Sequence, residues 1–355
     1  MSECSGTMVS WVNRDRHKGL RLLWLDDNFG VDDCDAIADD PQLHIVSNRY
    51  ELVHRLRERG LKAEFSDFVL PANAGHYDII YLRVAKERFL TRHLLNLSRQ
   101  CCAPDSALWL LGRKEDGIKT YHDACLKKLG FSGGLQKHKT QYHAELKLSS
   151  KNSPCIELDT GSYTRLREVH VFDGPEGPRP YYSKPGVYGW KKLDAGSEFM
   201  IAVLDTGLWP QDRAQRCIDL GCGSGHLSLV AAWRGFTNIT ATDNNATALE
   251  ACRFNVDAHA LSPVISVVPD DCAASFKEKT ELILCNPPFH KGFAVNTALS
   301  EKFVARCGHL LSKTGRAILV TNVFIGVERI SQKYRLHCRE LANNGQFKVQ
   351  ELRRG

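Results

Sequence analysis

The sequence predicts two α/β domains in tandem, and three observations lead to this fold class. The chain has 355 residues, and a domain typically has about 100–200, so the length favours two domains that can each bury a core. Each half alternates short apolar runs with helix-like segments, which is typical of a parallel sheet covered by helices. Between the halves, residues 151–189 are rich in proline and glycine, as expected of a connecting region.

The first half is predicted to be a degenerate domain over residues 1–160. Its four expected strands lie at residues 22–25, 43–46, 79–82 and 107–111. After the first of these runs comes Leu25-Asp26-Asp27-Asn28-Phe29-Gly30, which holds one glycine where a phosphate- or nucleoside-binding turn would need several. We therefore expect this half to have lost ligand binding at that position.

The second half is predicted to be the ligand-binding domain over residues 190–355, after a connecting region at 161–189. Its expected strands lie at residues 217–220, 239–242, 265–268, 282–284 and 317–320. Near the end, Asn344-Gly345 lies between two further strand-like runs, and this dipeptide predicts a hairpin turn. A final antiparallel pair is therefore expected at the edge of the second sheet.

Composition excludes several classes of protein. Hydrophobic residues make up 43% and charged residues 25% of the chain, which argues against a disordered or fibrous protein. A net charge of +6 favours a polyanionic partner only mildly. The 13 cysteines form no Cys-x-x-Cys pair and no zinc-finger spacing, so we expect reduced thiols and no metal site. No signal-peptide core and no run of about 20 apolar residues is found, so a cytoplasmic protein without membrane spans is expected.

A glycine-rich turn predicts the cofactor site. Residues 219–225 read Asp-Leu-Gly-Cys-Gly-Ser-Gly, between an expected strand and an expected helix. Gly221, Gly223 and Gly225 allow a sharp turn and the close approach of a ligand at the carboxyl edge of the sheet. S-adenosylmethionine needs such a turn together with separate polar partners. We expect Asp219 to orient its amino-acid end and Asp243, after the next strand, to accept the ribose hydroxyls.

The adenine partner is less narrowly defined by the sequence. Asp271 follows the third strand of this half and is expected to accept a hydrogen bond from the adenine amine. Its neighbour Asp270 is an alternative, and either carboxylate can instead cap a helix. A glycine-rich turn with a downstream carboxylate is also found in dinucleotide-binding folds, but the sequence offers no identifiable hydride-transfer residue.

An Asn-Pro-Pro-Phe run predicts the methyl-acceptor site. Asn286, Pro287, Pro288 and Phe289 follow the strand-like residues 281–285, so they are expected beside the cofactor. The amide oxygen of Asn286 and the carbonyl of Pro287 can each accept a hydrogen of an exocyclic amine and aim its lone pair at the methyl group. The two prolines restrict the backbone, and Phe289 can stack on a flipped-out base. Together with the glycine turn, this run indicates methyl transfer to a planar nitrogen.

These motifs resemble those of the bacterial ribosomal RNA guanine-N2 methyltransferases. The resemblance spans most of the chain and rests on residues 185–188, 193–197, 219–225, 285–290 with Gly292, and 343–349. Residues 110–119 and 322–324 are closer to the small-subunit enzymes of the family. It implies two tandem Rossmann-like class I methyltransferase domains, of which only the carboxyl-terminal one keeps the cofactor site. It also implies that the amino-terminal domain takes part in RNA recognition. The chain departs from the family pattern at Tyr188, where phenylalanine is more common, and at Trp190-Lys191-Lys192, where a shorter polar turn is usual.

The leading hypothesis is therefore methylation of the exocyclic N2 of a guanine in 16S ribosomal RNA, with the 30S subunit as partner and a monomeric enzyme. Large-subunit 23S RNA is the nearest alternative, and adenine-N6 methylation fits the motif chemistry alone. Glutamine methylation of a release factor uses the same Asn-Pro-Pro device, although those enzymes usually carry tyrosine where this chain has Phe289. A non-catalytic RNA-binding or ribosome-assembly protein is the alternative from a different class.

Overall fold

The computed structural model divides the chain into two compact units, Met1–Arg165 and Leu166–Gly355. It describes residues 3–16, 18–27, 31–70, 76–148, 155–174, 177–287, 290–291, 294–295 and 297–355. Strands β8 (Arg167–Phe172) and β9 (Arg179–Ser183) fall within the predicted connecting region, and they belong to the second unit as an antiparallel ribbon.

The first unit is built on a seven-stranded sheet in the order β3-β2-β1-β4-β5-β7-β6. The first five strands in this order are parallel, whereas β7 runs antiparallel to both β5 and β6. Its elements are α1 (Glu3–Asp15), β1 (Leu22–Leu25), the 3-10 helix η1 (Val31–Ala36), β2 (Leu43–Ser47), α2 (Tyr50–Glu58), β3 (Ala63–Phe65), β4 (Tyr77–Arg83), α3 (Arg88–Cys101), β5 (Cys102–Arg113), α4 (Ile118–Lys127), β6 (Leu135–His138) and β7 (Gln141–Lys147).

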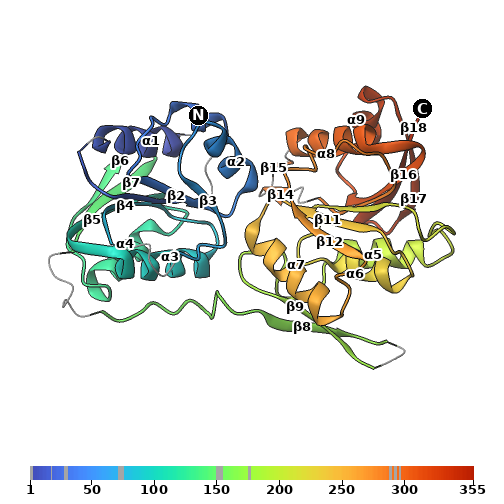
Figure 1. Ribbon diagram of the computed structural model, residues 1–355, viewed down its shortest axis with the longest axis horizontal. Helices are drawn as coiled ribbons and strands as arrows, with labels where there is room; N and C mark the ends of the chain where they lie inside the picture. The colour runs from blue at the N-terminus through green and yellow to red at the C-terminus, as the bar shows by residue number, and fades with distance from the viewer. Residues whose placement is uncertain are drawn as a thin grey trace. The chain divides into compact units, whose positions relative to one another are not determined.

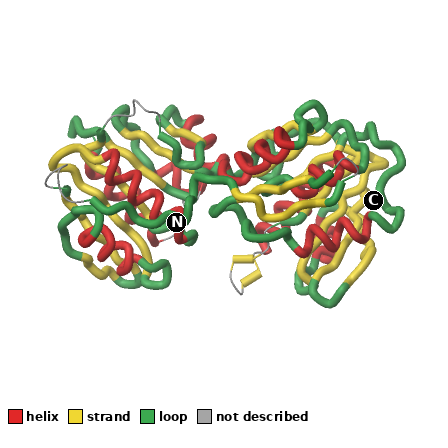
Figure 2. The backbone as a smooth tube through the Cα atoms, turned by 90° about the horizontal axis from the view of Figure 1, so that it is seen from below, coloured by secondary structure: helices red, strands yellow, loops and turns green. Residues whose placement is uncertain are grey.

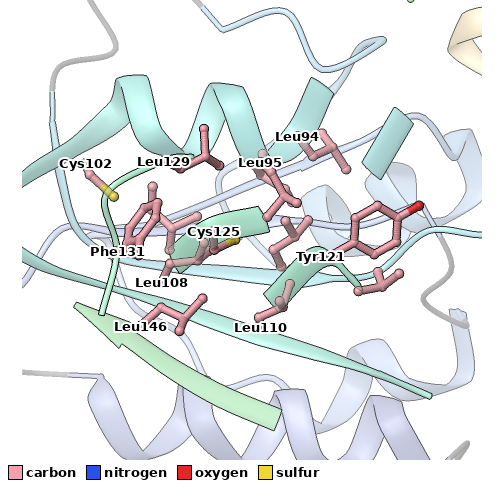
Figure 3. Packing of buried hydrophobic residues seen from close by; sticks show 14 of the residues in the cluster. Leu94, Leu95, Cys102, Leu108, Leu110, Tyr121, Cys125, Leu129, Phe131 and Leu146 are labelled. Carbon is pink, nitrogen blue, oxygen red and sulfur yellow. The ribbon is translucent and has the colours of Figure 1, made fainter. Parts of the chain in front are cut away.

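Successive residues of the central strand β1 are buried on opposite faces of this sheet. Leu23 and Leu25 pack with side chains of α3 and α4 in one core, whereas Leu22 and Trp24 pack with side chains of α1 and α2 in another. Such two-sided burial explains why the strand reads as a continuous apolar run, since both faces of a parallel sheet are covered by helices. Figure 3 shows the first of these cores, in which side chains of α3 and α4 lie against those of β5 and β7.

The second unit repeats this topology with its own seven-stranded sheet, in the order β12-β11-β10-β13-β16-β18-β17. In Figure 1, α8 and α9 cover one face of this sheet and α5, α6 and α7 the other, and the tube in Figure 2 shows the strands layered between helices. Besides β8 and β9, its elements are α5 (Ala195–Leu204), β10 (Cys217–Leu220), α6 (His226–Trp233), β11 (Ile239–Asp243), α7 (Ala246–Ala258), β12 (Ile265–Pro269), β13 (Thr280–Cys285), β14 (His290–Lys291), β15 (Ala294–Val295), α8 (Thr297–Leu310), β16 (Leu311–Asn322), α9 (Val327–Lys333), β17 (Leu336–Asn343) and β18 (Phe347–Arg354).

This pair of sheets confirms the predicted fold class of two tandem Rossmann-like domains. Each of the nine strands expected from apolar runs is present, and the Asn344-Gly345 turn joins the antiparallel strands β17 and β18. The extra strands β3, β6 and β7 of the first unit and the β8–β9 ribbon were not expected, because they contain many polar residues and form no continuous apolar run.

The two sheets also share their register, which locates the difference between the units. In both, the first residue of the central strand pairs with the first residue of its neighbour. This correspondence places Trp24 where the second unit has Asp219, and Ser47 where it has Asp243. The first unit therefore lacks the two carboxylates as well as the glycines of the predicted cofactor site, as expected of a degenerate copy.

Candidate active site

The glycine-rich turn connects β10 to α6 and has a backbone that only glycine adopts readily. Gly221, Gly223 and Gly225 have φ angles of +83°, +54° and +89°, in the left-handed region where other residues are strained. A Cβ atom at Gly225 would lie 2.7 Å from the sulfur of Cys252, so this position is also sterically closed. A Cβ atom at Gly223 would meet nothing within 4 Å. The turn therefore exposes open backbone at Gly223, where a ligand can approach it.

Asp219 is a buried carboxylate in which one oxygen accepts hydrogen bonds and the other has no donor among the described residues. Its Oδ2 accepts hydrogen bonds from the backbone N–H of Ser228 (2.9 Å) and from the Ser228 hydroxyl (2.6 Å). Its Oδ1 has no partner among the described residues, although the side chain is only 1% exposed. Burial raises the pKa of Asp219 to about 7, and the nearby Asp243 carboxylate adds to the shift. A buried acceptor of this kind suits a cationic donor such as an ammonium group.

Asp243 ends β11 and connects that strand to the glycine turn. Its Oδ2 accepts from the backbone N–H of Gly223 (3.0 Å), and its Oδ1 accepts from the backbone N–H of Asn245 (2.9 Å). A carboxylate has about four lone-pair sites, so these contacts leave capacity for further donors. Asp243 thus both positions the open part of the turn and presents an acceptor beside it.

The two neighbouring carboxylates after β12 have different partners. Asp270 is buried and accepts from the backbone N–H groups of Ala274 (2.5 Å) and Ser275 (3.2 Å), so it caps the turn that follows β12. Asp271 instead forms an ion pair with Lys302 of α8, and its side chain is 22% exposed. Of the two candidates left open by the sequence, Asp271 is the one that does not close a turn, and it stays a prediction.

Asn286 follows β13 at the carboxyl edge of the same sheet. Leu284, two residues earlier, pairs directly with Asp219, so the sheet register brings Asn286 next to the glycine turn. Pro287 is buried. Pro288 and Phe289, the other two residues of the predicted acceptor site, lie outside the described residues.

The Asn286 amide is held in one orientation by two side chains of the α5 amino terminus. Its Nδ2 donates to Asp194 Oδ1 (2.5 Å) and to Ser197 Oγ (2.8 Å). A carboxylate can only accept, so the NH₂ group must face Asp194 and the amide oxygen must point elsewhere. Among the described residues that oxygen has no hydrogen-bond donor, so it is available to a substrate.

Sequence reasoning did not identify Asp194 and Ser197 as site residues. Asp194 is the N-cap of α5, and its carboxylate also accepts from the backbone N–H of Ser197 (2.8 Å). An aspartate three residues before a serine at the start of an apolar run was a visible signal for a helix cap. Its second role depends on a residue 92 positions away, which no local pattern reveals.

A second unpredicted contact connects the β8–β9 ribbon to the glycine turn. Asn255 of α7 is fully buried; its Oδ1 accepts from Tyr182 N–H (2.8 Å), and its Nδ2 donates to the carbonyls of Tyr182 (2.8 Å) and Ser224 (2.9 Å). The hydroxyls of Ser183 and Ser224 lie 2.8 Å apart. The end of β9 therefore supports the turn from outside the sheet.

No group of three or more His, Cys, Asp or Glu residues suited to a metal ion occurs in the part of the chain that the structure describes. Likewise, none of its helices is both long enough and apolar enough to cross a membrane.

Comparison with known proteins places the second unit among methyltransferase domains. The family model described as "Methyltransferase small domain" matches residues 180–351. A "Ribosomal RNA small subunit methyltransferase C" of Pseudomonas aeruginosa is 28% identical over 92% of this chain and 93% of its own length. The protein of that name from Stutzerimonas stutzeri is 28% identical over 79% and 80%, respectively.

A solved structure reproduces the fold over nearly the whole chain. It is described as the Thermus thermophilus "16S rRNA N2 G1207 methyltransferase (RsmC) in complex with AdoMet and Guanosine". The match has a TM-score of 0.81 with 20% sequence identity, and it covers 99% of this chain and 92% of that one. Both sheets of the tandem fold are therefore shared with that structure.

The buried state of Asp219 predicts a pH-dependent stability in the absence of ligand. Its pKa is about 7 in the folded protein and 3.8 ordinarily, so between these values the unfolded chain releases a proton that the folded protein keeps. The free energy of unfolding then falls as the pH rises from about 4 to 7 and stays lower above that range. The side chain of Asp219→Asn is neutral at every pH. The free energy of unfolding of this variant, relative to that of the wild type, is therefore expected to be higher at pH 8 than at pH 5.

Chemical denaturation at both pH values measures this difference, with the exposed Asp257→Asn as the matched control. A difference between wild type and Asp219→Asn that does not change with pH would show that Asp219 is already ionised in the folded protein.

Proposed function

We propose that the chain belongs to the family of bacterial ribosomal RNA guanine-N2 methyltransferases and that it methylates the exocyclic N2 of a guanine in 16S ribosomal RNA, with S-adenosylmethionine as methyl donor. The observation that carries the proposal is the Asn286 amide, which is fixed by Asp194 so that its oxygen is free beside the glycine turn. A planar amine acceptor needs such an oriented oxygen rather than a strong base.

The residues of the turn fit the cofactor. When bound, S-adenosylmethionine supplies an electrophilic methyl group on a positive sulfonium. The unpartnered Oδ1 of Asp219 would accept from its ammonium group, and the open backbone at Gly223 would lie against its amino-acid and ribose portions, with Gly221 and Gly225 shaping the turn. Asp243 would accept the ribose hydroxyls. We assign the adenine amine to Asp271 on the basis of its place after β12.

The acceptor residues would hold the guanine amine by its two hydrogens. The Asn286 Oδ1 accepts one and the backbone carbonyl of Pro287 accepts the other, so the nitrogen lone pair is directed toward the cofactor side. Alignment of this kind contributes several kcal/mol to lowering a barrier. We further propose that Pro288 restrains the Pro287 carbonyl and that Phe289 stacks on the flipped guanine.

The small ribosomal subunit is the proposed substrate. The two bacterial relatives are named as small-subunit methyltransferases, and the Thermus thermophilus protein is named for position G1207. The corresponding guanine is the first candidate target here. We propose that the enzyme acts as a monomer on the 30S subunit in the cytoplasm and that its first unit contributes to RNA recognition.

The direct test is transfer of labelled methyl groups from S-adenosylmethionine to purified 30S and 50S subunits that lack their native methylations. We expect N2-methylguanosine in the 30S RNA, identified by nucleoside mass spectrometry. Label confined to 50S RNA would assign the large-subunit reaction instead. Transfer to a release factor, or none at all, would refute RNA methylation.

The different roles proposed for Asn286 and Asp243 predict that their substitutions affect different quantities. Asn286→Ala removes the oriented acceptor, so kcat should fall at least about 100-fold while the dissociation constant of S-adenosylmethionine stays near the wild-type value. Asp243→Ala removes a cofactor contact and a support of Gly223, so the loss should lie chiefly in cofactor affinity. Isothermal titration calorimetry together with steady-state kinetics separates the two. Equal losses of cofactor affinity in both variants would contradict these roles.

The position of Asp194 predicts a separable effect of Asp194→Ser. Serine is as good an N-cap as aspartate, so α5 should remain capped, but its shorter side chain no longer reaches Asn286. We expect kcat to fall roughly 10- to 100-fold because the amide loses its fixed orientation, with unchanged cofactor affinity and nearly unchanged thermal stability. A wild-type kcat would show that Ser197 alone orients the amide, which Ser197→Ala and the double variant would test.

A further inference from the structure

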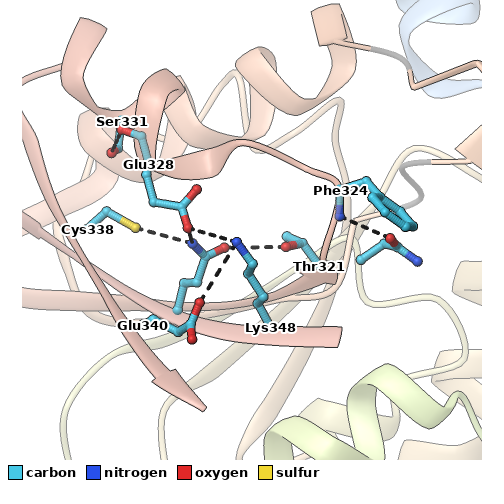
Figure 4. A network of polar contacts seen from close by, with 9 residues as sticks. Thr321, Phe324, Glu328, Ser331, Cys338, Glu340 and Lys348 are labelled. Atoms are coloured by element: carbon cyan, nitrogen blue, oxygen red, sulfur yellow. Dashed lines mark hydrogen bonds and ion pairs between the residues drawn. The ribbon is translucent and has the colours of Figure 1, made fainter. Parts of the chain in front are cut away.

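Two aromatic side chains of the second unit are unusually exposed. Phe324 is 82% exposed, more than any other large hydrophobic side chain in the described ranges, and Tyr188 is 65% exposed. Phe324 lies just after β16, where its backbone N–H donates to Asn322 Oδ1 (3.2 Å). Figure 4 shows its ring apart from the neighbouring polar network, in which Glu328 binds Lys348 and Gln350. Nothing in the packing of the unit requires a phenylalanine at this position.

Phe324 stands at the edge of the sheet that carries Asn286. Strands β13 and β16 are parallel neighbours, with Cys285 paired to Leu319, so both strands end on the same side. Asn322 pairs with Phe347 of β18. Phe347 in turn lies against the start of α5, because a Cβ atom at Gly196 would be 3.4 Å from its ring.

Tyr188 stands on the opposite flank of Asn286. The loop before it is fixed beside the cofactor side of the site, because the Asn245 Nδ2 donates to the Gly186 carbonyl (3.3 Å) and Val187 packs against α7. In the sheet order β11-β10-β13-β16, the strand β13 that precedes Asn286 lies between the other two. The loop before Tyr188 is fixed beside the end of β11, and Phe324 follows β16.

Two lysines follow Tyr188 in the chain. Lys191 and Lys192 are exposed, and neither forms an ion pair with a carboxylate of the described residues. Trp190 lies between Tyr188 and these lysines in the sequence. The Arg167 guanidinium is 5.3 Å from the centre of the Trp190 ring, and the Lys191 ammonium is 5.7 Å from it. Exposed aromatic rings interleaved with unpaired cations are the combination that binds single-stranded nucleic acid, by base stacking and phosphate contact.

We propose that Phe324 and Tyr188 stack on the nucleobases on either side of the target guanine, while Lys191 and Lys192 contact the adjoining phosphates. This inference rests on the proposed RNA methyltransferase function and adds the contacts that hold the flanking nucleotides. Flipping a base out of a strand leaves its neighbours without a stacking partner on one face. A ring at each side of Asn286 would replace that partner and keep the strand open around the site.

The test is the dissociation constant for a fluorescein-labelled single-stranded RNA centred on the methylated guanine, compared with the same RNA carrying abasic sites at both neighbouring positions. Phe324→Ala and Tyr188→Ala should each weaken binding of the intact RNA about 5- to 150-fold, the range of one base–aromatic stack. On the abasic RNA neither substitution should have an effect. Phe324→Trp should restore affinity for the intact RNA.

Phe254→Ala is the matched control, because Phe254 is a half-exposed ring of the same unit that packs on Tyr182. Equal losses on intact and abasic RNA, or losses no greater than that of the control, would overturn the proposal. Cofactor affinity should be unchanged in all variants, and a change there would mark a structural effect instead. Methyl transfer by the wild type to 30S subunits tests the proposed function separately, so the two can fail independently.

Discussion

The parallel pairing of β10 with β11 and β13 is the constraint on which the candidate site depends. Parallel strands end on one side of a sheet, and loops at those carboxyl ends are where open α/β folds bind ligands. In this register Asp219 is paired with Leu284, two residues before Asn286, while Asp243 ends the strand on the other side of β10. The side chains of Asp219, Asp243 and Asn286 are thus brought to one edge of the sheet by the backbone pairing of these strands. A shift of one strand by a single residue would turn its site residue to the opposite face.

The two units show that this strand order and register form with different residues at the positions of Asp219 and Asp243. The first sheet keeps the strand order and register of the second, but its central strand has Trp24 at the position of Asp219. Trp24 is buried, and its indole N–H donates to Asp26 (3.2 Å), so an apolar ring with one satisfied donor occupies the space. Replacing a buried carboxylate by such a residue removes a desolvation cost. In the second unit the Asp219 carboxylate is held by Ser228 through one oxygen, and its other oxygen has no donor among the described residues.

Much of this organisation could be predicted from local sequence. All nine expected strands are present, and central ones such as β1 were recognisable because burial on both faces produces a continuous apolar run. The glycine turn was recognisable because its φ angles admit few other residues. Contacts between distant segments could not be predicted in the same way. Asn286 and Asp194 are 92 residues apart, and Asn255 and Tyr182 are 73 apart.

These unpredicted contacts have a common physical role, which is to fix groups that must not move. Asp194 and Ser197 fix which face of the Asn286 amide carries its nitrogen, and without them either the nitrogen or the oxygen could take the position of the oxygen. Using a helix cap for this purpose places the restraint on a rigid element, because Asp194 is already held by the backbone of α5. Asn286 is therefore satisfied on its donor side before any ligand arrives, whereas Asp219 keeps a buried oxygen without a donor. The Asn286 amide is therefore preorganised, whereas Asp219 keeps an unfavourable burial that a hydrogen-bond donor would relieve.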